Sequence, residues 1–313
     1  MTTLTRDDLL ADESVSTVRE LPNKEVAPVP SIGSSAMLVE LSISTWTGRK
    51  KDKRASEDVT ARANAKAGVA NVSKKLLGDC QELIAIQKFT ANVRNIHYAM
   101  TMPWSDTGLR LLPTAQFFRY QEQLTALDQE YRSLVNTFLR EYDDEIVTAQ
   151  LKLGDLFDPN EYPTSDSLQS KFGFRLSYIP LPDTGDFRID VGNEATAQIK
   201  AEYESYYSTQ LRTAMNDVWR RAYDALSKMS ERLDYTDVKK TFRDSLVHNV
   251  TDMIELLNVC NVTNDSQMSA MAMRLEDALR GVTPDALRED GRLRAETKRV
   301  VDDAIKSLPS LDF

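Results

Sequence analysis

The sequence has little of what enzymes use for catalysis. It contains two histidines in 313 residues, and neither lies beside a nucleophile in a catalytic motif. A Walker loop, a dinucleotide fingerprint and a Gly-x-Ser-x-Gly motif are all missing. The aspartates Asp183, Asp186 and Asp190 lack the glutamate that a calcium loop requires. We therefore predict a protein that is not an enzyme, with no catalytic residues, no metal site and no cofactor.

Cysteine and long apolar runs are also scarce. Cys80 and Cys260 are the only cysteines, and two thiols so far apart indicate neither a metal motif nor a disulfide framework. We expect both to be reduced and mostly buried. No apolar run approaches the roughly 18 residues of a membrane span, and the first residues lack the regions of a signal peptide. These absences predict a soluble intracellular protein without membrane contact.

Glycine and proline number 11 each, which is low for this length and favours long helices. The clearest periodicity follows Pro113, a residue suited to a first helical position. Apolar side chains then recur at alternating spacings of three and four, the pattern of a heptad seam. The seam consists of Phe117, Tyr120, Leu124, Leu127, Tyr131, Leu134 and Phe138. The pattern predicts a helix over 113–153, about 60 Å long.

A second long helix is predicted over 193–233, with its own apolar stripe. Because the two helices have similar lengths, we expect them to pair as an antiparallel hairpin. A heptad seam can also join copies of one chain, so we expect self-association as well.

Strand patterns are few and short. Apolar and polar residues alternate from Met37 to Ile43, and 172–179 and 186–191 have the character of short strands joined by turn residues. The strand over 37–43 can pair with the other two strands and make a three-stranded sheet. The fold class is therefore predicted to be mainly α with a small β element (α+β). It consists of a long antiparallel helical hairpin with a short β-hairpin or three-stranded sheet near its tip.

Three regions are predicted along the chain. Residues 1–35 form a flexible lead, 36–235 form the helical core with the small sheet, and 236–313 form a C-terminal helical region of three helices. In that last region Thr236 and Thr283 are the expected helix starts and Gly281 an expected stop. Within the core, an alanine-rich helix is expected from Ser56 to Gly78, and another from about Asp79 to Pro103.

Positive charge is concentrated in one segment of an acidic chain. Between Arg49 and Leu77 there are nine Lys or Arg and three Asp or Glu, a net charge of +6. The whole chain carries −9, so the rest carries −15. Such segregation indicates a polyanion or an acidic partner. The alternative is a solvated turn and an ordinary helix, with the adjacent Trp46 in the core.

The candidate site for nucleic acid consists of these cations and Trp46. The cations would contact phosphates, and Trp46 would stack on an unpaired base, which a single strand offers and a duplex does not. The predicted nucleic-acid-binding residues are Trp46, Arg49, Lys50, Lys51, Lys53, Arg54, Arg62, Lys66, Lys74 and Lys75.

Several short phrases resemble a group of tailed-phage proteins, most of which have no assigned function. These phrases are Ser44–Arg54, His97-Tyr98, Met102–Trp104, Arg110–Pro113 and Gly185–Asp190. The chain is also similar in character to the single-stranded-DNA-binding transcription regulators of podoviruses that carry a giant virion RNA polymerase. This resemblance implies single-stranded DNA binding, self-association, a phage RNA polymerase as partner, and a place in the host cytoplasm.

A second hypothesis involves no nucleic acid. Similar phage proteins lie beside a MoxR-type AAA+ ATPase and a von Willebrand-type partner, which would make this chain an oligomeric adaptor. Salt-dependent DNA binding and co-purification with an ATPase distinguish the two hypotheses.

Overall fold

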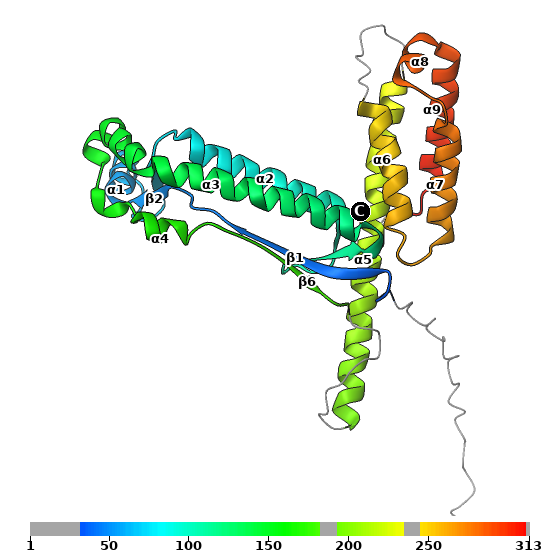
Figure 1. The fold of residues 1–313 in the computed structure, drawn as a ribbon, viewed down its shortest axis with the longest axis horizontal. Coiled ribbons are helices and arrows are strands. Elements are labelled where there is room, and N and C mark those ends of the chain that lie inside the picture. The colour runs from blue at the N-terminus through cyan, green and yellow to red at the C-terminus, as the bar shows by residue number, and fades with distance from the viewer. Residues whose placement is uncertain (1–31, 182–192, 235–244, 311–313) are drawn as a thin grey trace, which may run out of the picture. The chain divides into compact units, whose positions relative to one another are not determined.

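The computed structural model describes residues 32–181, 193–234 and 245–310 (Figure 1). The described chain is mainly helical with small antiparallel sheets, which confirms the predicted fold class. The lead predicted for residues 1–35 lies almost wholly outside the described residues, as does the strand predicted over 186–191. None of the described helices is long and apolar enough to cross a membrane.

The helical hairpin is formed by α2 (Gln81–Met100) and α3 (Phe117–Leu153), which pack along each other (Figure 1). They are antiparallel, because His97 at the end of α2 bonds Tyr120 near the start of α3, while Cys80 lies beside Glu145. Both ends of α2 agree with the prediction. Helix α3 also ends as predicted, at Gly154 with φ 51°.

The predicted partner of α3 was wrong. Helix α5 (Asn193–Leu233) has the predicted bounds, but it packs mainly on two C-terminal helices rather than on α3. Equal length does not select a partner, whereas the chain between α2 and α3 turns back through β4 and β5 and brings those two helices together. The seam of α3 packs inside the chain, with Tyr120, Leu124 and Phe138 fully buried in the core. It therefore gives no support to self-association.

The larger sheet has the strand order β4-β5-β1-β6, all antiparallel. Its members are β4 (Met102–Pro103), β5 (Leu109–Pro113), β1 (Ala36–Ser44) and β6 (Gly173–Ile179). The pairing of β1 with β6 confirms the expected addition of the first strand. Strands β4 and β5 were not predicted, because they are short and have no alternating pattern. Buried side chains of β1 and β5 contribute to the core that α2 and α3 share.

The basic segment folds differently from its prediction. It forms β2 (Arg49–Asp52), α1 (Lys53–Arg62) and β3 (Val72–Lys75), with β2 and β3 paired as a two-stranded ribbon. Asp52 caps α1 by accepting from the Ala55 N–H at 2.9 Å, so the helix begins before Ser56. It also ends early, because Asn64 and Gly68 adopt positive φ. High alanine propensity did not carry the helix to Gly78.

A series of short elements connects α3 to β6. These are the 3-10 turns η2 (Gly154–Leu156) and η3 (Pro159–Glu161) and the short helix α4 (Ser165–Gln169). A third 3-10 turn, η1 (Thr114–Gln116), precedes α3, so Pro113 ends β5 instead of opening the helix.

The C-terminal region has four helices in its described residues, where three were expected. They are α6 (Ser245–Val259), α7 (Ser266–Leu279), α8 (Pro284–Glu289) and α9 (Gly291–Lys306). Thr283 caps α8, and Gly281 adopts φ 74° just after α7, as predicted. The expected start at Thr236 lies outside the described residues. Helix α5 contacts α6 and α9 across the predicted boundary at 235 and 236.

Candidate nucleic-acid interface

The β2–β3 ribbon places basic side chains on an exposed face. Arg49 lies opposite Lys75, and Lys51 lies opposite Ser73. Because side chains alternate along a strand, these four residues share one face, and all four are exposed. The other face carries Lys50, which is exposed, and Asp52, Val72 and Lys74, which are half-buried. The ribbon therefore presents three cations in two cross-strand rows, with about 7 Å between successive side chains on one face.

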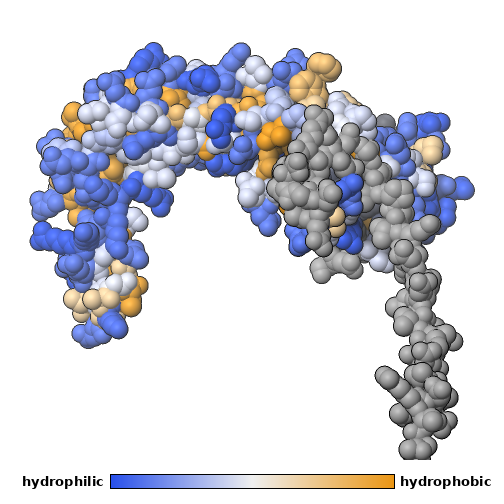
Figure 2. Space-filling view, turned by 90° about the horizontal axis from the view of Figure 1, so that it is seen from below, coloured by the Kyte–Doolittle hydropathy of each residue, from blue (hydrophilic) through white to orange (hydrophobic). Residues whose placement is uncertain are grey.

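Seven of the predicted cations are exposed and form no ion pair within the described parts of the chain. We call them the basic tip. They are Arg49, Lys50, Lys51, Lys53, Arg54, Arg62 and Lys66. Figure 1 places their elements, β2 and α1, at one end of the α2–α3 hairpin. At the same end in Figure 2 the surface is mostly hydrophilic, with a small hydrophobic area at its margin.

Lys74 and Lys75, by contrast, form ion pairs. The Lys74 Nζ lies 2.6 Å from Glu161 Oε2 and donates to the Leu156 carbonyl at 2.7 Å, and its side chain is only 10% exposed. Lys74 thus fixes β3 to the turns after α3, and its predicted role as a phosphate-binding residue is not supported. Lys75 is more exposed and pairs with Asp79 at 2.9 Å. The hydrogen bond from Lys75 lowers the pKa of Asp79.

Trp46 is half-buried and belongs to the core, which was the alternative left open by the sequence. Its ring meets the edge of Tyr142 with centroids 5.9 Å apart, and the Phe138 ring lies at 6.3 Å. Two residues later Gly48 adopts φ +61°, and a Cβ there would come 2.7 Å from Leu83 Cδ2. The chain therefore enters the ribbon pressed against α2. Trp46 is not a free stacking platform, and the predicted stacking role is not supported.

An open hollow beside the basic tip was not predicted. It has a volume of about 450 Å³ and lies between α1 and the loop that follows it. Its walls are small side chains, with Lys51 and Lys53 also in its lining. The one available signal in the sequence was the run of alanine and glycine after α1, which was interpreted there as helix propensity.

The histidine in α2 is a structural group. His97 Nδ1 lies 2.7 Å from the Tyr120 hydroxyl in a buried hydrogen bond. Burial, with a smaller effect from the nearby Arg110 guanidinium, lowers the His97 pKa to about 4. The ring is therefore neutral at physiological pH, and it is enclosed by the helical hairpin.

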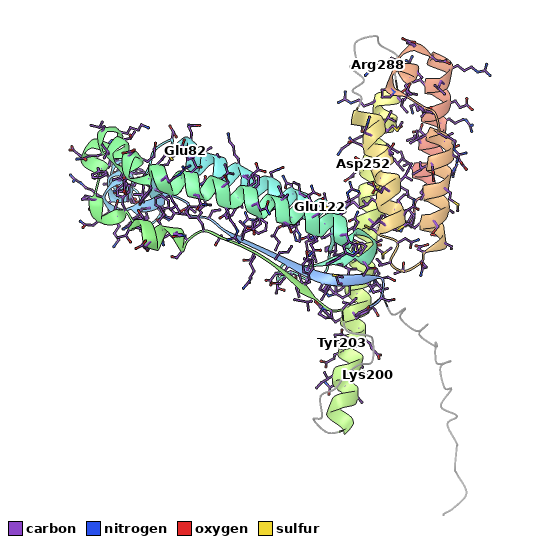
Figure 3. All side chains as sticks on the ribbon, viewed as in Figure 1. Glu82, Glu122, Lys200, Tyr203, Asp252 and Arg288 are labelled. Atoms are coloured by element: carbon purple, nitrogen blue, oxygen red, sulfur yellow. The ribbon has the colours of Figure 1, made fainter. Side chains whose placement is uncertain are left out.

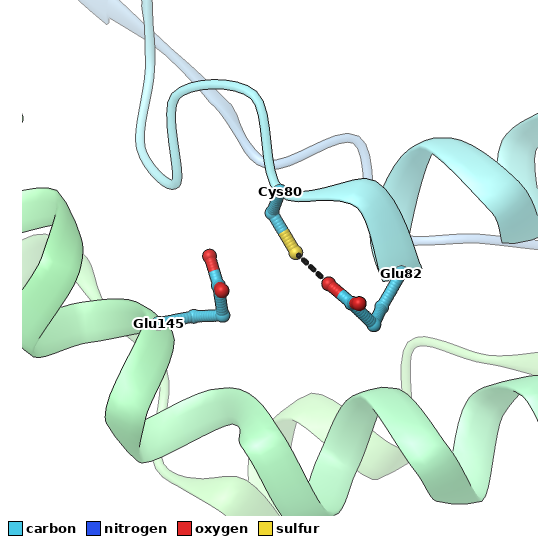
Figure 4. A group of neighbouring side chains, drawn as sticks. All are labelled: Cys80, Glu82 and Glu145. Carbon is cyan, nitrogen blue, oxygen red and sulfur yellow. Dashed lines mark hydrogen bonds between the residues drawn. The ribbon is translucent and has the colours of Figure 1, made fainter.

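Cys80, Glu82 and Glu145 form a small cluster between the start of α2 and the end of α3 (Figure 4). The Cys80 thiol donates to Glu82 at 3.4 Å, and Glu145 approaches from the opposite helix. Glu82 lies in the first turn of α2 (Figure 3). Burial, strengthened by both carboxylates, raises the Cys80 pKa to about 12. Since the thiolate is the nucleophile and the metal-binding form, Cys80 is poorly suited to either role at neutral pH.

Cys260 is also buried, and burial raises its pKa to about 12. Both cysteines are thus buried thiols, as the sequence suggested.

Comparison with protein-family models, with curated proteins and with solved structures finds no match to this chain. The charge and geometry of the basic tip are therefore the main indications of function.

Proposed function

We propose that this protein is a non-enzymatic phage protein that binds single-stranded DNA through the basic tip and supports phage transcription or replication. The observation that carries the proposal is the basic tip itself. Seven exposed cations without ion pairs in the described chain stand together in a protein whose net charge is −9. Repulsion among these cations is a cost to the fold, and a bound polyanion would remove it.

Phosphate binding accounts for the arrangement better than a carboxylate-bearing protein surface does. Lysine and arginine that stay unpaired and hydrated release counterions from a nucleic acid when they bind it. For single strands, affinity then falls with salt by about 0.7 log units per decade for each phosphate contacted. Contacts from all seven residues of the basic tip would give a slope near −5, and contacts from half of them a slope near −2.5.

Fluorescence anisotropy of a labelled single-stranded oligonucleotide across a salt series tests the proposal. The variant K50A/K51A/R54A removes three cations from the basic tip. We expect at least a tenfold loss of affinity at low salt and a slope reduced by about 2. The matched control K200A/R212A/K228A removes the same charges from exposed positions on α5 and should bind like the unmodified protein.

Two results would overturn the proposal: no binding by the unmodified protein even at low salt, or equal binding by both triple variants. Absence of binding would favour the oligomeric adaptor without nucleic acid, and co-purification with a MoxR-type AAA+ ATPase would then be the next measurement. Equal binding by both variants would mean that DNA is bound outside the basic tip. A phage RNA polymerase partner is part of the proposal, and a pull-down with the DNA-bound protein tests it separately.

A further inference from the structure

The hollow beside the basic tip has apolar walls and a charged rim. Five of its ten lining residues are alanine or glycine, and Lys51, Lys53 and Glu57 are the charged residues among those that line it. The small residues are Ala61, Ala65, Ala67, Gly68 and Ala70. A volume of about 450 Å³ falls within the range of about 300–1,000 Å³ that is usual for small-molecule sites.

The polar groups of the wall are already satisfied by the backbone. The Ser56 hydroxyl donates to the Asp52 carbonyl and accepts from the Val72 N–H at 2.9 Å. The Thr60 hydroxyl donates to the Ser56 carbonyl at 2.7 Å. The bond from Val72 joins α1 to β3, and both hydroxyl groups already donate to backbone carbonyls. An occupant therefore gains mainly contact area from these two side chains.

The loop that closes the hollow is fixed to α1. The Ala65 N–H donates to the Thr60 carbonyl at 3.0 Å, and the Ala63 N–H donates to the Val59 carbonyl at 3.1 Å. Gly68 adopts φ +87°, and no atom lies within 4 Å of the position that its Cβ would take. The start of the loop is thus held against α1, and the space beside Gly68 is open, so a flat group can approach there without displacing a side chain.

We infer that this hollow accepts one unpaired base of a single strand whose phosphates contact the basic tip. The inference rests on the proposed function. Charge complementarity chooses the occupant, because Lys51 and Lys53 at the hollow form no ion pair in the described chain and would hold a phosphate beside it. A base has an apolar face but is already stacked in a duplex. The hollow would therefore supply the preference for single strands that Trp46, packed in the core, does not.

The test compares two oligonucleotides of equal length and charge, one with bases and one built entirely of abasic sites. Contact with a base is worth about 1–3 kcal/mol, which corresponds to about 5- to 150-fold. We expect the unmodified protein to bind the base-containing strand at least fivefold more tightly. In A61L/A67L, where leucine side chains fill the hollow, this preference should disappear while the salt slope stays the same.

The control A63L adds the same side chain at an exposed position outside the hollow and should keep the preference. If A61L/A67L does not fold by circular dichroism, A65L fills the hollow from the loop and takes its place. The inference is wrong if the unmodified protein binds both strands equally, or if the filled variant keeps the preference. Absence of binding to both strands at low salt would instead refute the proposed function.

Discussion

The buried hydrogen bond between His97 and Tyr120 shows how a single pair links the two helices of the hairpin. It joins α2 to α3 over 2.7 Å, and both side chains are almost fully buried. Burial lowers the His97 pKa to about 4 and raises the Tyr120 pKa, so each group is held in its neutral form. The pair therefore holds the hairpin together through a neutral hydrogen bond that depends on pH.

We predict that this pair makes the protein sensitive to mild acid. As pH falls from 6.5 to about 4, His97 takes up a proton in the unfolded chain but not in the folded protein. The free energy of unfolding should therefore decrease over this interval, by about 3 kcal/mol for this group at most. Urea unfolding at a series of pH values measures the decrease.

The variant H97N serves as the comparison, because it has no imidazole to protonate. Its stability should be lower at pH 7 and should change less between pH 6.5 and 4. An NMR titration of the imidazole, assigned with an H248Q variant, gives the pKa directly. Equal pH dependence in the two proteins, or titration of His97 near 6.5, would contradict the prediction.

At the scale of elements, the sequence predicted helix ends better than helix partners. The bounds of α2 and α5 and the end of α3 followed from proline, glycine and apolar spacing, which are local signals. The start of α3 did not, because Pro113 ends β5. The pairing of α3 with α2 depended on the route of the intervening chain through β4 and β5, two strands with no alternating pattern. Ribbon formation overrode alanine propensity in the same way, because β3 pairs with β2, a strand distant from it in the sequence.

In the candidate site, the sequence predicted the charge pattern but not how the side chains pack. Charge asymmetry identified seven residues that are exposed and unpaired in the described chain, since lysine and arginine stay hydrated unless a partner is built for them. It could not identify Lys74 as an internal contact, because Glu161 is distant in the sequence. Nor could it decide whether Trp46 faces solvent, which depends on the rings of α3. The hollow required the turn after α1, where the run of alanine and glycine was interpreted as helix.

Gly48 provides a test of how closely the ribbon is joined to the hairpin. We predict that G48A destabilises the protein by about 2–4 kcal/mol, through a positive φ and a 2.7 Å approach of the new Cβ to Leu83. The control G108A has φ +102° but no atom within 4 Å, so it should carry the backbone cost alone, about 1–2 kcal/mol. Urea unfolding compares the two, and equal losses would show that Leu83 yields to the added methyl group.

At the scale of the molecule, one arginine joins α5 to the end of the hairpin. The Arg221 guanidinium donates to the carbonyls of Tyr98, Ala99 and Thr101, at 2.9–3.0 Å, and pairs with Asp217 at 2.6 Å. Two of these carbonyls belong to the last turn of α2. The carbonyls there have no N–H partner within the helix, and the helix dipole favours a cation at this end. Helix α5, which also contacts α6 and α9, is thereby tied to α2.

We predict that R221A lowers the free energy of unfolding by about 2–4 kcal/mol, because three carbonyls lose a charged donor and Asp217 loses a partner. The control R220A removes an exposed arginine whose one partner among the described residues is Asp217, and it should cost less than about 0.5 kcal/mol. Urea unfolding measures both. DNA affinity in the folded state should stay unchanged in R221A, because Arg221 lies outside the basic tip. A loss of DNA binding with R221A still folded would mean that α5 takes part in recognition, and that the basic tip does not act alone.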